Sequence, residues 1–233
     1  MPINAPDEVK NLPAYTLAEA ARYIGVSETT LRTWFRGKPA VSTKKGGFRR
    51  AAIKPILPTG AGPGEPLSFL DLIIAHVLFS LRNSYKFPMG KVAKAKEYLA
   101  SLEGNLSFLA HKDFFHDHAD LYMGEDKNLL TLTQQGQMAD KTILASGLHQ
   151  IIYGSDGYAK EFFPKLGDTD QREFVVNPEI NYGRISIVRI GVKADALAAR
   201  YNAGEKMSDI AEDYGATPEE IVEAIRWHDR LAA

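Results

Sequence analysis

Two short helices joined by one tight turn are predicted between Tyr15 and Phe35, and this stretch restricts the fold more than any other. Thr16 and Glu19 have the T-x-x-E spacing of a capping box, in which each side chain satisfies a backbone N–H of the first helical turn. Gly25 marks the end of this first helix. The apolar residues between these signals recur at helical spacing, at Leu17, Ala20, Ala21 and Ile24.

The second helix is expected to begin after Ser27, a residue type favoured at helix N-caps. Val26 before the cap and Leu31 after it have the placement of a hydrophobic staple, which sets the direction in which the chain enters the helix. Two caps this close together predict a helix-turn-helix, whose second helix lies in a DNA major groove. We therefore expect DNA contacts from its outward residues, which are Thr29, Thr30, Arg32, Thr33 and Arg36.

The distribution of charge indicates that the N-terminal part of the chain, which we call the front end, faces DNA. Residues 1–64 hold ten bases and four acids, a net charge of +6; because the whole chain has a net charge of −1, the remainder carries −7. No Asp or Glu occurs from Thr29 to Gly64. Bases that neutralise phosphates supply most of the non-specific affinity for DNA. The alternative is a basic surface loop on a helical domain that does not bind DNA.

A β-hairpin is predicted soon after the second helix, because Gly46 and Gly47 form a turn signal between basic flanks. We call this hairpin the wing, since hairpins of this sort lie along the phosphate backbone beside a helix-turn-helix. The bases of the wing expected to contact DNA are Lys44, Lys45, Arg49 and Arg50.

The order of these signals resembles the winged DNA-binding domain of MerR-type regulators. The shared features are T-L-R in the second helix, ending at Arg32, a Gly-aromatic-Arg wing ending at Arg49, and an S-x-x-D start at Ser68 and Asp71 that opens an apolar helix. The resemblance implies that Arg32 and Arg49 contact DNA. Residues 1–104 are therefore expected to form a MerR-like winged helix-turn-helix with supporting helices.

Two supporting helices are expected in this first region. One runs from Leu67 to Arg82, and its apolar residues cover more than one face, so the rest of the fold or a second subunit must bury it. The other begins at Pro88, a residue type suited to the first helical turn. For either helix, ordinary core is favoured over a dimer interface.

The middle region, residues 105–172, carries the weakest signals. Residues 121–133 predict a hairpin, and Gln137 to Ile152 predict a helix. Imidazoles and carboxylates of the kind that bind metals crowd into ten residues, at His111, Asp113, His116, Asp117, His118 and Asp120. Their spacing matches no helical zinc motif, so we favour a solvated loop, with a metal-dependent hydrolase as the alternative.

The C-terminal region, residues 173–233, predicts strands followed by three helices. Strands are expected at residues 174–176 and from Ile185 to Val192. The last two helices repeat the opening pattern, because Gly215 stops one and Thr217 with Glu220 caps the next. Residues 204–233 hold eight acids and three bases, a net charge of −5, so we expect this unit to bind protein rather than DNA.

Residues 177–225 resemble the small antitoxin domain known as domain of unknown function four-three-three. The shared pattern is a glycine at Gly183, a short strand, a helix ending in A-G-E, and the segment from Ile210 to Gly215 before a capped helix. Where that family has a Gly-Thr turn after the strand, this chain has Arg189-Ile190. A strand that continues there would change the local shape.

Together, the two resemblances imply a VapB-type antitoxin in which both domains are fused. Such a protein would neutralise a PIN-like, Mg²⁺-dependent ribonuclease toxin encoded beside it and repress their shared operon. The implied partners are operator DNA and the toxin, in a homodimer or a toxin–antitoxin hetero-oligomer. Arg226 and Arg230 are the bases expected to meet toxin carboxylates. The alternative is a MerR-like transcriptional regulator whose C-terminal domain senses a ligand.

Composition and motifs limit the remaining classes. The expected fold class is α+β, mainly α. The chain lacks cysteine, which fits a reducing cytoplasm, and its N-terminus lacks the pattern of a signal peptide. The longest apolar stretch, Leu67 to Leu81, is too short to span a bilayer. Because no nucleophile motif or phosphate-binding loop occurs, we expect neither catalysis nor a cofactor.

Overall fold

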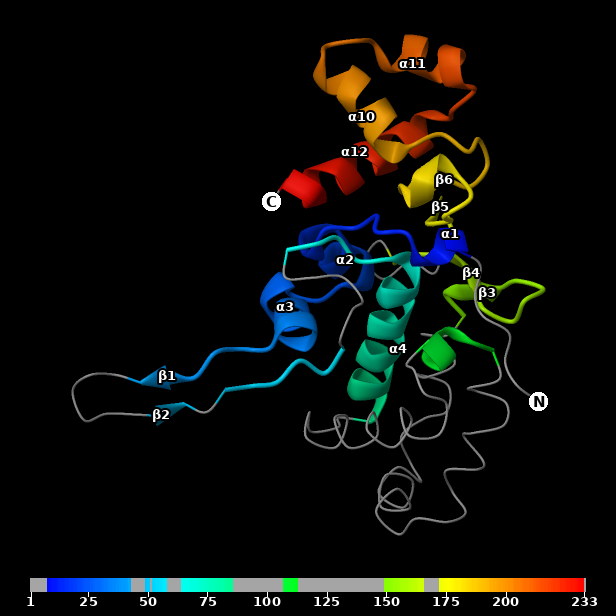
Figure 1. Ribbon diagram of the computed structural model, residues 1–233. Helices are drawn as coiled ribbons and strands as arrows, with labels where there is room; N and C mark the ends of the chain where they lie inside the picture. Colours follow the sequence, from blue (N-terminus) through cyan, green and yellow to red (C-terminus); the bar gives the residue numbers. More distant parts are fainter. Residues whose placement is uncertain are drawn as a thin grey trace.

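The computed structural model describes residues 8–42, 49–50, 52–57, 64–85, 107–112, 149–165 and 172–232. These residues form helices and small antiparallel sheets, so the α+β, mainly α class is confirmed (Figure 1). The helices are α1 (Glu8–Asn11), α2 (Leu17–Ile24), α3 (Glu28–Arg36), α4 (Phe69–Tyr85), α10 (Ala194–Asn202), α11 (Met207–Tyr214) and α12 (Pro218–Ala232), with 3₁₀ turns η1 (Ser107–Ala110) and η2 (Asn181–Gly183). The strands are β1 (Val41–Ser42), β2 (Arg49–Arg50), β3 (Ile151–Tyr153), β4 (Ala159–Phe162), β5 (Phe174–Val175) and β6 (Ser186–Ile187), paired in sequence order.

The capping signals act as expected at both helices of the helix-turn-helix. The Thr16 hydroxyl accepts a hydrogen bond from the N–H of Glu19 at 3.1 Å, and the Glu19 carboxylate accepts one from the N–H of Thr16 at 2.8 Å. Gly25 ends α2 with a φ of 81°, a left-handed conformation that favours glycine. The Ser27 hydroxyl then caps α3 by accepting from the N–H of Thr30 at 3.2 Å.

The buried helix α4 begins two residues later than its apolar run predicts. Leu67 pairs its backbone with Tyr15, and its N–H donates to the Tyr15 carbonyl at 2.7 Å. Ser68 and Asp71 form the expected cap: the Asp71 carboxylate accepts from the N–H of Ser68 at 2.9 Å. Burial raises the pKa of Asp71, although its hydrogen bonds from Ser68 oppose this shift. The helix starting at Pro88 lies outside the described residues.

The middle region differs from expectation where it is described. Ile151 and Ile152, the expected end of the helix from Gln137, instead belong to strand β3, which pairs antiparallel with β4. The helix prediction is therefore wrong for this segment. Ile151 is buried, and β-branched side chains at 151 and 152 suit a strand. The hairpin expected over residues 121–133 lies outside the described residues.

The C-terminal region confirms its three helices and corrects one strand. Thr217 and Glu220 cap α12 reciprocally, with hydrogen bonds of 2.8 and 3.2 Å. Strand β6 covers only Ser186–Ile187, because the chain then turns: the N–H of Gly191 donates to the Ile187 carbonyl at 2.8 Å, and Gly191 has a φ of 66°. The prediction of a strand continuing to Val192 is therefore wrong.

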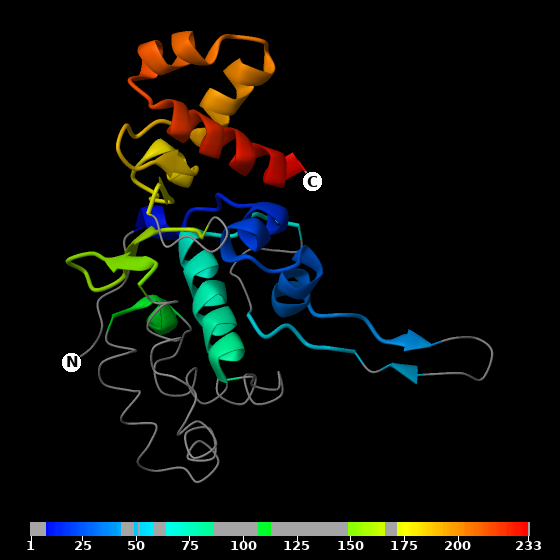
Figure 2. The same ribbon diagram turned by 180° about the vertical axis from the view of Figure 1, so that it is seen from behind.

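A continuous set of buried residues runs from Tyr15 in the front end to Trp227 in α12. Figures 1 and 2 show α12 lying over α2, with α4 below both. The described parts of residues 1–104 and 173–233 therefore pack against each other and share one core. The domain boundaries at residues 104 and 172 stay a prediction. Within the described residues, no helix is long and apolar enough to cross a membrane.

Candidate nucleic-acid interface

Helix α3 divides into a buried face and a face open to solvent. Leu31, Trp34 and Phe35 are buried in the core and hold the helix in place. Thr29 and Arg32 are exposed, while the other outward residues, Thr30, Thr33 and Arg36, are half-buried. The five residues predicted to contact DNA therefore lie on the side of α3 away from the core.

Several of these side chains already have partners within the chain. The hydroxyl of Thr30 lies 2.8 Å from that of the N-cap Ser27, and the hydroxyl of Thr33 donates to the Thr29 carbonyl at 2.7 Å. Arg32 pairs with Glu28 one turn earlier. Because this pair is largely exposed, it contributes little stability, and Arg32 can exchange Glu28 for a phosphate or a guanine at small cost.

Arg36 has a structural contact that the sequence did not reveal. Its guanidinium donates to the Glu65 carbonyl at 2.8 Å and so ties the end of α3 to the segment before α4. The two residues are 29 positions apart, and no local pattern signals their contact.

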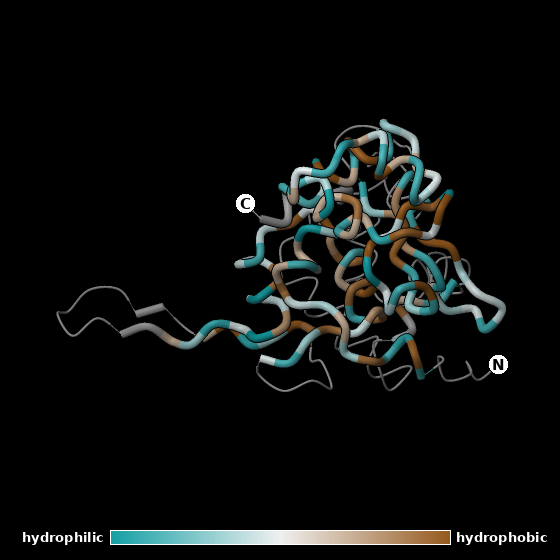
Figure 3. Tube along the Cα trace, turned by 90° about the horizontal axis from the view of Figure 1, so that it is seen from above, coloured by the Kyte–Doolittle hydropathy of each residue, from teal (hydrophilic) through white to brown (hydrophobic). Residues whose placement is uncertain are grey.

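The wing follows α3 as an antiparallel ribbon. Val41 pairs with Arg50 and Ser42 with Arg49, and the bridge between Lys38 and Ile53 continues the same register. Figure 3 shows that the described chain segments leading to this ribbon extend away from the body of the protein. Arg49 and Arg50 thus lie on β2, whereas Lys44 and Lys45 lie outside the described residues.

The base of the wing is hydrogen-bonded directly to α3. The Trp34 carbonyl accepts hydrogen bonds from the N–H groups of Ile56 and Leu57, at 2.7 and 2.9 Å. Gly37 ends α3 with a φ of 70°, and a Cβ there would lie 2.2 Å from the Ile53 carbonyl oxygen. Only glycine fits this close approach, so it sets how the wing leaves α3.

Of the six His and Asp residues from His111 to Asp120, only His111 lies in the described part of the structure. His111 is buried, with 5% of its surface exposed, and its ring meets that of Tyr158 edge-on with centroids 4.8 Å apart. The solvated-loop expectation is therefore wrong for His111, since it packs as a core residue against Tyr158 and Gly157. Asp113, His116, Asp117, His118 and Asp120 lie outside the described residues. Among the residues that are described, no group of three potential ligands could hold a metal ion.

Arginines of the C-terminal region form ion pairs with several of its carboxylates. Arg189 donates to both oxygens of Glu220, at 2.9 and 2.6 Å, and this contact lowers the pKa of Glu220. Arg200 pairs with Glu205 and with Asp213. Arg226, predicted to contact a toxin, pairs with Glu223, although its side chain is 65% exposed. The side chain of Arg230 lies outside the described part of the structure.

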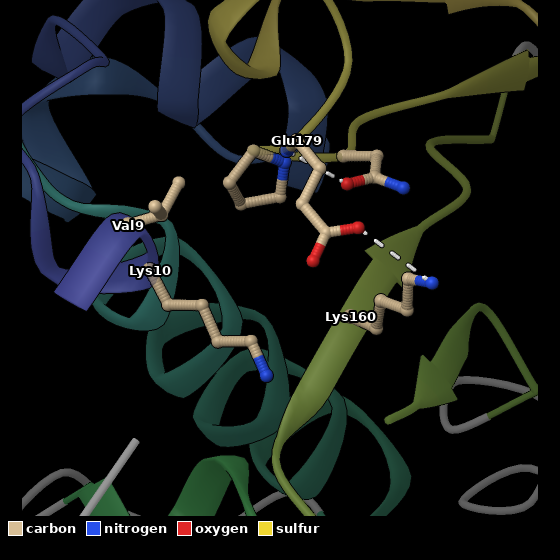
Figure 4. Close-up of a pocket in the computed structure, with 6 residues that line it drawn as sticks. Val9, Lys10, Lys160 and Glu179 are labelled. Carbon is tan, nitrogen blue, oxygen red and sulfur yellow. Dashed lines mark hydrogen bonds and ion pairs between the residues drawn. The ribbon is translucent and has the colours of Figure 1, made fainter. Parts of the chain in front are cut away.

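A shallow crevice lies between α1, β4 and the loop of residues 177–179 after β5 (Figure 4). Lys10 and Lys160 line it on opposite sides, and Lys160 pairs with Glu179 at 3.6 Å. Its volume is about 190 Å³. Because this space includes open solvent, the crevice does not enclose a small molecule as ligand sites do, and it gives little support to a C-terminal domain that senses a ligand.

Comparison with known proteins identifies the front end. A family described as "Putative DNA-binding HTH domain" matches residues 13–95, which include α2, α3, the wing and α4. The N-terminal region is a helix-turn-helix DNA-binding domain. The exposed face of α3 and the adjoining wing are accordingly its candidate DNA-contacting surfaces.

Two relatives from Mycobacterium tuberculosis resemble nearly the whole chain. The protein named "Putative antitoxin VapB45" is 28% identical over 236 residues, covering 96% of this chain and 95% of the relative. "Uncharacterized protein Rv2308" is 28% identical over 221 residues, covering 91% and 88%. The crystal structure of Rv2018 from the same organism has a TM-score of 0.65 at 27% identity, covering 92% of this chain and 98% of that one. The chain thus contains a helix-turn-helix domain and is similar over nearly its whole length to the protein named "Putative antitoxin VapB45".

Proposed function

We propose that this protein is the antitoxin of a type II toxin–antitoxin system, which represses its own operon and neutralises a PIN-like ribonuclease toxin. The observation that carries the proposal is the similarity to an antitoxin over 96% of the chain, since it includes both the helix-turn-helix and the C-terminal unit. The proposal assigns the protein no catalytic activity of its own. It would act in the cytoplasm, where operator DNA and toxin meet.

The front end is suited to repression by binding operator DNA. In the proposed complex, α3 lies in the major groove and the wing follows the phosphate backbone. Arg32 and Arg49 contact guanines or phosphates, as the MerR resemblance implies, and Thr29 offers an exposed hydroxyl. A dimer would place two copies of α3 on an inverted repeat, with half-sites about one or two helical turns apart.

The rear end is suited to a protein partner. Residues 204–233 carry a net charge of −5, which disfavours contact with nucleic acid. In the proposed complex this unit masks the metal site of the toxin or the path of its RNA. Arg226 and Arg230 would meet toxin carboxylates, and Arg226 would exchange its exposed pairing with Glu223 for such a contact.

The proposal is tested by expressing the neighbouring open reading frame with and without this protein. We expect the neighbour alone to stop growth, co-expression to restore it, and the two proteins to co-purify. A gel-shift assay with the upstream operon DNA should show specific binding by this protein. A harmless neighbour that does not co-purify would contradict the antitoxin proposal and favour the ligand-sensing regulator instead.

A further inference from the structure

Tyr182 is held almost entirely in solvent at the tip of the turn η2. Its side chain is 87% exposed, the highest value of any large hydrophobic residue in the described ranges. Its backbone is also unusual, because Asn181 and Tyr182 have φ angles of 49° and 56°. These are the left-handed values that residues other than glycine rarely adopt, and they are the only such residues among those described. The fold therefore maintains an unfavourable conformation that exposes an aromatic ring.

Side-chain hydrogen bonds lock this turn in place. The amide of Asn181 donates to the Ser186 hydroxyl and to the Gly191 carbonyl, both at 2.8 Å. On the other side, Gly183 packs so closely on Tyr15 that a Cβ there would lie 2.1 Å from the tyrosine hydroxyl. Tyr182 thus projects from a rigid base, and binding through its ring would lose little conformational entropy.

Two further exposed apolar residues lie in this turn and in the turn bonded to it. Ile180, which is 38% exposed, lies beside Asn181 in the chain. Val188, which is 48% exposed, lies in the turn before Gly191, whose carbonyl accepts the hydrogen bond from Asn181. We call Ile180, Tyr182 and Val188 the apolar patch. Its exposed aromatic and aliphatic side chains are of the kind that anchor protein interfaces.

An acidic corner of the fold is joined to the turn that carries Val188. Arg189, next to Val188, donates to the Gly215 carbonyl at 2.6 Å and pairs with Glu220, so the turn lies against the corner between α11 and α12. That corner carries exposed Glu212 and Glu219, together with Asp213, which pairs with Arg200. The arginines nearest the patch, Arg184 and Arg189, are engaged with Glu19 and Glu220. Lys193 after the turn is an exposed base, but the corner itself carries exposed carboxylates, so it suits a basic protein better than the phosphates of a nucleic acid.

From this arrangement we infer that the Tyr182 ring anchors the toxin by filling an apolar recess of the toxin that lies beside the toxin's basic surface. The inference rests on the proposed function, because it takes the toxin as the partner. A ribonuclease must present basic residues to bind RNA phosphates, and the α11–α12 corner supplies the complementary charge. The anchor would thus place the acidic corner over the RNA path of the toxin.

The test measures the affinity of the full-length protein for the purified product of the neighbouring gene, using isothermal titration. Tyr182→Asn removes the ring but keeps a residue type that tolerates left-handed backbone, so the turn is retained. We expect this substitution to weaken binding by about 30-fold or more, as at an interface hot spot. Tyr182→Phe should change affinity by less than about threefold, because the ring remains.

Tyr201→Asn is the matched control, since Tyr201 is also an exposed tyrosine of the C-terminal region, at 41%, on α10. It should leave affinity nearly unchanged. Unaltered melting temperature and operator affinity for Tyr182→Asn would show that the turn and the front end remain folded.

If wild type binds the neighbouring protein and Tyr182→Asn binds it equally, the anchor is overturned while the antitoxin proposal stands. If wild type does not bind at all, the antitoxin proposal fails and the anchor with it. Loss of operator binding or of self-association by Tyr182→Asn, with toxin affinity retained, would assign the patch to DNA or to a second copy and overturn the inference.

Discussion

The ring of Tyr23 packs against the indole of Trp227 with centroids 5.7 Å apart, joining the first helix of the helix-turn-helix to the last helix of the chain. Phe174 stacks on the same indole at 5.8 Å. Nearby, Arg184 pairs with Glu19, the residue that completes the cap of α2. The DNA-binding end and the C-terminal unit are therefore expected to unfold together, and point substitutions report on each end better than truncation does.

Removing the indole at this junction should destabilise both ends of the molecule. Trp227 is 97% buried, so Trp227→Ala leaves a cavity and should lower the free energy of unfolding by about 3–5 kcal/mol. Arg226→Ala, at an exposed neighbouring position, should change it by less than about 0.5 kcal/mol. Urea unfolding followed by circular dichroism measures both. A Trp227→Ala protein that unfolds in two separate transitions, with the front end unaffected, would contradict the shared core.

The glycine between α3 and the wing offers a test of wing placement. Gly37→Ala combines a positive φ with a Cβ only 2.2 Å from the Ile53 carbonyl, so the wing must shift. Gly25→Ala also has a positive φ, but nothing lies within 4 Å of its Cβ. Both should lose about 1–2 kcal/mol of stability from the backbone, and Gly37→Ala should in addition weaken operator binding. Equal operator affinity of the two folded variants, measured by fluorescence anisotropy, would argue against a wing that contacts DNA.

The predicted wing lysines should set the salt dependence of DNA binding. Replacing Lys44 and Lys45 with alanine should weaken binding to all sequences and reduce the slope of log K against log salt by about one per lost phosphate contact. Lys193 and Lys206, which are exposed in the C-terminal region, provide a matched double substitution that should leave the slope unchanged. An identical slope in both double variants would refute phosphate contacts from the wing.

The ion pair between Lys10 and Asp156 should make stability fall in acid. Their atoms lie 2.6 Å apart; burial raises the pKa of Asp156, but the hydrogen bond and charge of Lys10 outweigh it and hold the pKa below its ordinary 3.8. The folded state thus binds fewer protons than the unfolded state, and the stabilisation present above pH 3.8 is lost as the pH falls further. Asp156→Asn should cost about 1.5–3 kcal/mol near neutral pH. That difference should shrink below pH 3.8 in urea titrations; a difference independent of pH would exclude this charged pair.

Local signals in the sequence were sufficient for the helix-turn-helix and for the starts of two further helices. The caps at Thr16, Ser27, Ser68 and Thr217 all form as predicted, because a capping side chain needs only a backbone N–H two or three residues away. The antiparallel pairing of the wing followed equally from its turn residues. The positions of α3 and β2, which carry most of the predicted DNA contacts, could therefore be derived without the fold.

Pairing between distant segments overrode local preference elsewhere. Residues 151–153 became a strand because residues 159–162 offered partners, and the apolar run after Ile187 turned at Gly191 because the Asn181 amide binds there. The contact of Arg36 with Glu65 likewise depends on how α3 meets the segment before α4.

The sequence by itself therefore determined where the DNA-binding helices begin and end, since caps and turns act within a few residues. Only the tertiary structure placed Trp227 against Tyr23, Arg184 against Glu19 and Tyr182 in solvent. Glu19 and Arg184 are 165 positions apart, and hydrophobic burial, which has no direction, does not specify from sequence alone which buried faces meet.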